Sequence, residues 1–566
     1  MKKIKSIASI ASMISIASMV SIASISCSDV ESNLVDFSKE LDTPNDTVYS
    51  LMGIIGKMQV VADRSIILGD IRSDMVSLTD NASADLQELA DFTASASNAY
   101  NNARDYYAII QNCNYYIDHV DTTLTKRGIS IFEKEYAAVK TFRAWTYLQL
   151  AINYGSVPFV LSPILTEKDA DPALYPKKNI DEICAYFISE LQPFVDTEFP
   201  SYGTVGPLNS RYFFIPVRVL LGDMCLWSGR YADAAQYYNA FLNHKDNPRP
   251  VQTSYNAAWA DYEFKNCYSN YTNIFSGTSE LLTAIPMAEE DYDGLRSYLS
   301  DVFTSTDDNF YYNQASYSSA YASLSKSQLY TLVHQNSATM LNDTIHPADT
   351  LEYKEDLMQG DLRLYSCVST KSRGSSDASY NKLQTSNSKF RTSSYVRLYR
   401  LAHVYLRYAE ALNRAGYPKM AFGILKYGLC QENYERLDCR GCRIFTDGDI
   451  QAAGALIAFN QYNFTRSNTT GLHSRGSGDV DCDTLYNIPE LPTLSDSILF
   501  VEDKICDEMA LETTFEGQRW FDLMRLAFHR GSDDFLAEKV ALRSGTRDAT
   551  LATRLQNRQN WYLPLE

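Results

Sequence analysis

Apolar residues recur at helical spacing along most of the chain. From Asp46 onward, stretches with apolar positions three and four residues apart alternate with loops rich in Ser, Asn, Asp and Gly. This spacing gathers the apolar side chains on one face of a helix, which then packs against a neighbouring helix. The pattern predicts an all-α protein in which residues 46–566 form a single domain.

Parts of this pattern match the 34-residue tetratricopeptide repeat, a pair of antiparallel helices that touch through small side chains. The clearest unit consists of Leu221, Gly222, Cys225, Gly229, Tyr231, Ala234, Tyr238 and Leu242. A second contains Ala409, Leu412, Gly416, Ala421, Leu425 and Leu429, and a third contains Ala144 and Tyr147. We therefore expect helix pairs near 94–160, 211–244 and 398–430, with insertions between them.

Two segments lack helical periodicity. Residues 245–330 are rich in Tyr, Ser, Asn and Asp, and residues 431–500 are polar with Gly-Ser turns. Long loops on a rigid scaffold usually carry function or are disordered. We predict a loop-rich ligand face in the first segment and a polar insertion in the second.

The first residues have the pattern of an export signal. A basic start precedes an uncharged run of Ser-Ile-Ala repeats, which predicts a signal peptide at 1–26. Ile25, Ser26 and Cys27 then resemble the lipobox of bacterial lipoproteins, although Ser24 stands where an aliphatic residue is usual. Lipidation of Cys27 would anchor the chain to a membrane through a tether at 27–45. A secreted protein without lipid is the alternative.

Composition narrows the range of ligands. The net charge is -18, with 69 acidic and 51 basic residues. Nucleic-acid binding depends on Lys and Arg that neutralise phosphates, so this balance argues against a nucleic-acid partner. The chain has 40 Tyr but 5 Trp. Tyrosine joins a flat face to a polar tip, which suits sugar stacking, although helical cores also use it.

Several stretches resemble the SusD/RagB family of outer-membrane nutrient-binding lipoproteins. They are AVKTFRAWTYLQLAINYGSVPFV, RLAHVYLRYAEALNRAG, EMALETTFEGQRWFDLMRL and the terminal YLPLE. The resemblance implies four tetratricopeptide-like helix pairs, a family-type C-terminal segment at 501–566 and a location on the surface of a Gram-negative bacterium. It also implies a partner, a SusC-like TonB-dependent β-barrel transporter. For Arg519, Asp522 and Arg525 we expect ion pairs within one helix.

The resemblance implies capture of oligosaccharides for import, without enzymatic activity. Ligand residues vary within the family and lie on loops after the first helix and in the middle insertion. The candidates are Arg72, Asp74 and Asn81 in the first region, and Trp259, Tyr311 and Tyr312 in the second. Aromatic rings stack on sugars, while charged and amide groups bond their hydroxyls. Peptide binding, a surface glycosidase and a protein scaffold are the alternatives.

One acidic loop has the spacing of a calcium-binding loop. Its candidate ligands are Asp479, Asp481, Asp483, Asn487 and Glu490. Thr484 occupies the position that needs Gly, so a solvated acidic loop is the alternative reading and no cofactor is expected. Cys439 and Cys442 lack a second pair at zinc-ligand spacing. No metalloprotease, nucleophile-elbow or phosphate-loop motif occurs in the sequence.

Overall fold

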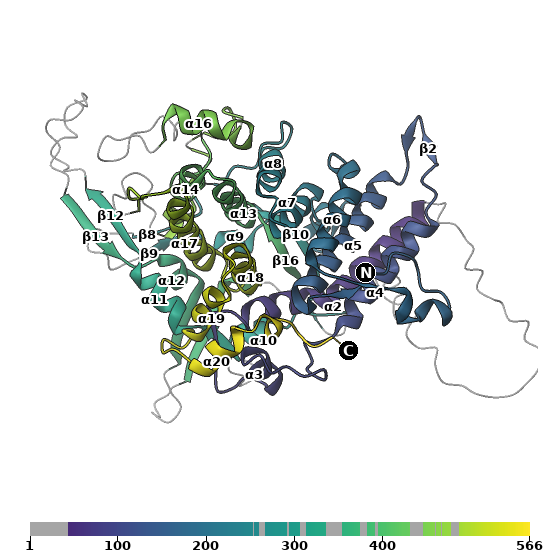
Figure 1. Cartoon of the computed structure of the whole chain (residues 1–566), viewed down its shortest axis with the longest axis horizontal. Coiled ribbons are helices and arrows are strands. Elements are labelled where there is room, and N and C mark those ends of the chain that lie inside the picture. The colour runs from purple at the N-terminus through teal and green to yellow at the C-terminus, as the bar shows by residue number, and fades with distance from the viewer. Residues whose placement is uncertain are drawn as a thin grey trace, which may run out of the picture.

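The computed structural model describes residues 44–252, 254–259, 267–290, 294–305, 313–334, 354–373, 382–390, 394–430, 445–458, 460–465, 467–476 and 486–565. Helices predominate in these residues, which confirms the all-α prediction (Figure 1). The candidate lipidation site Cys27 lies outside them. No helix in the described parts of the chain is long and apolar enough to cross a membrane.

The longer helices of the first half are α2 (Pro44–Asp70), α3 (Ala84–Ala90), α4 (Ala103–His119), α5 (Glu133–Tyr154), α6 (Ile180–Leu191), α7 (Val217–Trp227) and α8 (Tyr231–Leu242). Short helices follow at α9 (Asn273–Ser276), α10 (Leu299–Phe303), α11 (Ser319–Ser327) and α12 (Leu362–Cys367). The remainder are α13 (Leu401–Arg414), α14 (Pro418–Lys426), α16 (Asp447–Ala453), α17 (Leu494–Thr513), α18 (Arg519–Arg530), α19 (Asp533–Ala541) and α20 (Ala549–Leu555).

The main helices pack as a continuous array. α4 packs on α5, α5 on α6, α6 on α7 and α7 on α8, after which α13, α14 and α17 continue the series (Figure 1). The pairs α4–α5, α7–α8 and α13–α14 lie where the sequence predicts helix pairs, and α17–α18 forms another pair. The described helices therefore stack in the manner expected of tetratricopeptide-like units.

The α7–α8 pair shows why the spacing requires small side chains. A Cβ atom added to Gly222 on α7 would lie 2.5 Å from the Tyr238 ring on α8. The Tyr238 hydroxyl donates a 2.6 Å hydrogen bond to Asp223, so the ring is held in place. Gly423 of α14 is equally crowded, because its added Cβ would lie 2.3 Å from the Phe445 ring. Glycine permits this close approach.

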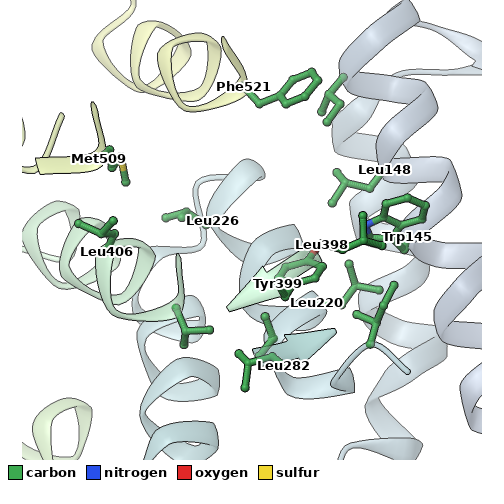
Figure 2. Close-up of a cluster of buried hydrophobic side chains, with 14 of the residues drawn as sticks. Trp145, Leu148, Leu220, Leu226, Leu282, Leu398, Tyr399, Leu406, Met509 and Phe521 are labelled. Carbon is green, nitrogen blue, oxygen red and sulfur yellow. The ribbon is translucent and has the colours of Figure 1, made fainter. Parts of the chain in front are cut away.

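The hydrophobic core lies where several elements converge on a small central ladder (Figure 2). This ladder pairs β10 (Leu281–Pro286) with β16 (Tyr395–Arg400), and both strands are buried. Figure 2 labels core side chains from α5, α7, β10, β16, α13, α17 and α18, namely Trp145, Leu148, Leu220, Leu226, Leu282, Leu398, Tyr399, Leu406, Met509 and Phe521. Residues far apart in sequence thus share one core.

The described strands form two-stranded antiparallel ladders. Near neighbours pair as β2 (Thr125–Lys126) with β3 (Ile129–Ser130), β4 (Val157–Pro158) with β5 (Lys177–Lys178), β6 (Thr204–Val205) with β7 (Leu208–Asn209), and β8 (Ala257–Trp259) with β9 (Cys267–Ser269). The others pair β1 (Val76–Leu78) with β11 (Ala315–Tyr317), β12 (Leu329–His334) with β13 (Lys354–Gln359), and β14 (Val368–Arg373) with β15 (Lys382–Asn387). Segment 245–330, expected to consist of loops, therefore contains short strands and helices.

A buried cluster of charges links the C-terminal segment to the middle of the chain. Glu512 on α17 accepts hydrogen bonds of 2.8 Å from Arg400, 3.0 Å from Arg475 and 2.8 Å from Arg363. Burial alone would raise the pKa of Glu512, but these guanidinium groups lower it to about 2. The acid therefore stays ionised, because a buried charge with partners is far less costly than an unpaired one.

The FEGQRWFDLMR motif holds two distant helices. Arg525 donates hydrogen bonds of 2.9 and 2.6 Å to the two oxygens of Glu410 on α13. It also pairs with Asp522 at 2.7 Å, which confirms the ion pair expected within this helix. The expectation for Arg519 is wrong, because its guanidinium binds Asp74 beyond the end of α2. Helical spacing shows neighbours on one helix and cannot show a partner from elsewhere.

The turn before α18 also touches α2 through its backbone. A Cβ atom on Gly69 would lie 1.9 Å from the carbonyl oxygen of Gly517, so the two backbone segments touch with no side chain between them. Gly517 has a φ of +73°, a conformation that glycine adopts without strain. Its N–H donates a 2.8 Å hydrogen bond to the buried carboxyl of Asp70. This contact fixes the C-terminal end of α2.

Candidate functional site

Two of the sequence candidates, Arg72 and Asp74, lie in the core. Arg72 is 1% exposed and donates hydrogen bonds to the Leu68 carbonyl, the Trp561 carbonyl and the Asn153 side chain. Burial lowers its pKa to about 9. Asp74 is 2% exposed and is held by Arg519. Neither side chain reaches a ligand at the surface, so their prediction as ligand contacts is corrected to a packing role.

The other candidates are placed differently. Asn81 is exposed in the turn between β1 and α3, and its N–H donates a 3.3 Å hydrogen bond to the Thr79 hydroxyl. Trp259 ends β8, which lies beside α12 and residues 473–476, while Tyr311 and Tyr312 lie outside the described residues. Among the candidates whose side chains are described, only Asn81 remains on the surface.

The two regions expected to carry ligand contacts do meet. β1 follows α2 and pairs with β11 of the middle insertion, from Val76 opposite Tyr317 to Leu78 opposite Ala315. The Thr79 hydroxyl donates a 2.6 Å hydrogen bond to the Asn313 carbonyl just beyond this ladder. We call the surface formed by residues 79–85, 95–101, 294–298 and 313–317 the loop face. It is the candidate binding surface.

Two tyrosines of the loop face come from segments far apart in the sequence. Tyr100 comes from the segment before α4 and Tyr298 from the segment before α10, and both are half-buried. They lie within electrostatic range of each other and of Asp63 on α2. Neither hydroxyl forms a hydrogen bond with a described residue. Both hydroxyls are therefore candidates for hydrogen bonds to a ligand.

Asp63 on α2 holds the segment that carries Tyr298. Its carboxyl is 1% exposed and accepts 2.7 Å hydrogen bonds from the Ser297 hydroxyl and the Tyr298 N–H. Burial raises its pKa to about 6. Burial, followed by the charges of Asp85 and Asp63, raises the pKa of Tyr100 to about 12. Burial, followed by the charge of Asp63, also raises the pKa of Tyr298, so both tyrosines stay neutral near pH 7 and can donate hydrogen bonds.

Neighbouring polar groups complete the loop face. Arg64 next to Asp63 donates a 2.6 Å hydrogen bond to Asp105 and fixes α2 against α4. The Asn98 side chain donates a 2.9 Å hydrogen bond to the Asp85 carbonyl, which ties the 95–101 segment to α3. A rigid surface with aromatic rings and free hydroxyls suits a ligand rich in hydroxyl groups.

The sequence candidates omit Asp63, Tyr100 and Tyr298. Asp63 and Arg64 are adjacent charged residues inside the apolar run QVVADRSIIL. Charges within an apolar helix could have indicated that Asp63 is buried with specific partners. Tyr100 and Tyr298 carry no such signal, because 197 positions separate them and many tyrosines here are buried. Only the fold brings them together.

The calcium prediction lies mainly outside the described residues. Asp479, Asp481 and Asp483 are not among them. Asn487 is half-buried and its side-chain oxygen accepts a 2.5 Å hydrogen bond from Lys426, while Glu490 is exposed. Within the described ranges, no three His, Cys, Asp or Glu side chains are placed to hold one metal ion.

Solved structures of SusD-superfamily proteins share this fold. One from Bacteroides vulgatus ATCC 8482 is 13% identical, with a TM-score of 0.54 over 90% of this chain and 91% of that one. Another from Bacteroides thetaiotaomicron VPI-5482 is 15% identical, with a TM-score of 0.52 over 85% and 89%. A SusD-like carbohydrate binding protein from Bacteroides fragilis NCTC 9343 is 13% identical, with a TM-score of 0.51 over 88% of each chain.

These similarities identify the architecture. No protein-family profile matches the sequence, and no curated protein matches it significantly. The chain has the SusD-superfamily fold along most of its length. At such low identity the likeness concerns the fold, so the ligand must be argued from this chain's own residues.

Proposed function

We propose that this protein is a cell-surface lipoprotein that binds oligosaccharides and delivers them to a SusC-like TonB-dependent transporter, without altering a covalent bond. The observation that carries the proposal is the SusD-superfamily fold, which spans most of the chain. One of the solved structures with this fold is a SusD-like carbohydrate binding protein. The loop face adds a compatible surface, in which Tyr100 and Tyr298 present rings and unbonded hydroxyls.

The proposed role of the loop face follows from sugar chemistry. Hydroxyl groups of a saccharide both donate and accept hydrogen bonds, while its C–H face is apolar. Two neutral tyrosines satisfy both demands. Asp63 accepts a hydrogen bond from the Tyr298 N–H, so the backbone that carries the ring is held before the ligand arrives. Such preorganisation reduces the entropy lost on binding.

The binding test uses the folded protein without residues 1–26. It is titrated calorimetrically with neutral oligosaccharides of different linkage and, separately, with peptides of mixed sequence. We expect saturable binding to at least one oligosaccharide and no release of reducing sugar. Binding of peptides alone would contradict the sugar assignment, and release of reducing sugar would indicate a glycosidase.

The anchoring step has its own test. Cys27→Ala removes the thiol that would carry the lipid, so the variant should appear in the soluble fraction of cells. Cys113→Ala, which alters a buried thiol, serves as a control and should leave the protein in the membrane fraction. Retention of both variants in the membrane would argue against the anchor.

A further inference from the structure

A groove beside the last described residues borders the loop face, because the Asn101 side chain donates a 3.1 Å hydrogen bond to the Pro564 carbonyl. It encloses about 700 Å³ and is formed by residues 92–94, by the end of α5, by β5 with the start of α6, and by residues 558–565. The Leu563 N–H donates a 2.8 Å hydrogen bond to the Asn153 carbonyl, which fixes the C-terminal segment along α5. The groove walls are therefore held by backbone contacts.

The polar side chains of this groove mainly offer hydrogen-bond donors. Lys177 is exposed on β5 and forms no ion pair with a described residue. Asn179 uses its side-chain oxygen to cap α6, and no described residue accepts a hydrogen bond from its amide group. Gln559 is exposed, and no described residue bonds its side chain. These groups line one continuous space.

Arg558 adds a second cation. Its Nε donates a 3.0 Å hydrogen bond to one oxygen of Asp533, and Nη2 contacts the same oxygen. Nη1 forms no hydrogen bond with a described residue. The side chains of the described residues lining the groove include no carboxylate, although the whole chain carries a net charge of -18. The lining therefore carries basic but no acidic side chains, although Asp533 pairs with Arg558 from outside it.

An aromatic ring completes the groove. Tyr562 is half-buried, and its ring lies over Gly155, where an added Cβ would be 3.4 Å from the ring. Its hydroxyl forms no hydrogen bond with a described residue. An aromatic ring beside amide donors suits a sugar ring, and Lys177, which has no ion pair with a described residue, suits a carboxylate substituent on that sugar.

We infer that this groove is a second binding site, for a saccharide that contains uronic acid. Lys177 and Arg558 would bind the sugar carboxylate, while Asn179 and Gln559 would bond its hydroxyls. The inference goes beyond the proposed function, which concerns the loop face and requires no charge on the sugar. A neutral sugar would leave Lys177 without a counter-charge, whereas Arg558 already has one in Asp533, so an acidic sugar is favoured through Lys177.

The test titrates the protein calorimetrically with hexagalacturonate and with a neutral hexasaccharide. We expect saturable binding of hexagalacturonate that weakens at high salt, because salt screens exposed charges. Lys177→Gln should weaken that binding about tenfold, since a charge-assisted hydrogen bond is lost. Gln559→Ala should weaken it less. Lys168→Gln, at an exposed lysine outside the groove, should leave it unchanged.

Each contrary outcome overturns the inference. These outcomes are no binding of hexagalacturonate, equal affinity for the neutral hexasaccharide, or equal binding by the Lys177→Gln variant and the unmodified protein. If Tyr298→Ala abolishes hexagalacturonate binding and Lys177→Gln leaves it unchanged, the sugar binds at the loop face and not in this groove. Neutral sugar binding that depends on Tyr298 tests the proposed function separately, so the two can fail independently.

Discussion

Arg519 donates two parallel hydrogen bonds of 2.7 Å, from Nε and Nη2, to the two oxygens of Asp74. Arg519 is 1% exposed and Asp74 2% exposed, and 444 positions lie between them. Burial alone would raise the pKa of Asp74, but Arg519 lowers it below its usual range. This pair joins the segment after α2 to α18.

Arg519→Ala should strongly destabilise the protein. It leaves the Asp74 carboxylate buried without its bidentate partner, and breaking such a pair costs about 3–5 kcal/mol. Chemical denaturation should show a lower midpoint with little change in slope. Arg547→Ala breaks the exposed pair with Glu538 and should leave the midpoint unchanged. Equal stability of both variants would contradict the structural role of Asp74.

Gly222→Ala should reduce the free energy of unfolding by about 1–3 kcal/mol, because the added methyl group overlaps the Tyr238 ring. Gly53→Ala is a matched control on the exposed side of α2, where no atom lies within 4 Å of the added Cβ. That change should stabilise the protein by about 0.5–1 kcal/mol through helix propensity. Thermal unfolding should therefore show a lower melting temperature for Gly222→Ala and a higher one for Gly53→Ala than for the unmodified protein.

Glu410→Gln should make stability less dependent on pH in acid. Burial alone would raise the pKa of Glu410, but Arg525 and His529 lower it to about 2. A lowered pKa contributes stability above about pH 4.5 that is lost as the pH falls toward 2. The variant should be less stable than the unmodified protein at pH 7, and the difference should narrow below pH 4. A constant difference would contradict ionised Glu410.

Asp70→Asn should show the opposite dependence. Burial raises the pKa of Asp70 to about 7, so the folded state holds this proton more tightly than the unfolded state does. Its contribution to stability is present below about pH 4 and is lost as the pH rises through 7. Relative to the unmodified protein, the variant should therefore gain stability between pH 4 and 8. Denaturation midpoints across this range measure the difference.

Tyr298→Ala and Tyr100→Ala should each weaken binding of a neutral oligosaccharide about tenfold, because a stacking ring and a hydroxyl donor are removed. The Tyr298 N–H still bonds Asp63 in the variant, so the local backbone should persist. Tyr462→Ala alters a tyrosine that is 92% exposed outside the loop face, and should leave affinity unchanged. Calorimetric titration with the same sugar compares the three variants.

Much of the helical framework could be predicted from local spacing. The periodic positions around Gly222 and Tyr238 specify a helix pair within about twenty residues, so sequence alone indicates their contact. The resemblance through the Arg519 motif likewise indicated the fold. These signals are short-range, and each repeats a pattern that many helical proteins share.

The candidate site could not be predicted in the same way. Arg72 and Asp74 have side chains that suit a sugar, but their partners Asn153 and Arg519 come from distant helices and draw both into the core. Tyr298 reaches the loop face because Asp63 on α2 binds its backbone N–H. Residue type indicates chemistry, whereas exposure depends on contacts that cross the whole chain.

The backbone contact between Gly69 and Gly517 determines when α2 can complete its packing during synthesis. During synthesis, the first described helix emerges long before the turn that covers its end. Until residues 515–519 are made, α2 lacks its final contact and leaves apolar surface open to aggregation. A chain truncated ahead of that turn also lacks α18, and it should misfold although the earlier helix pairs are complete. Contacts this distant in sequence also slow folding.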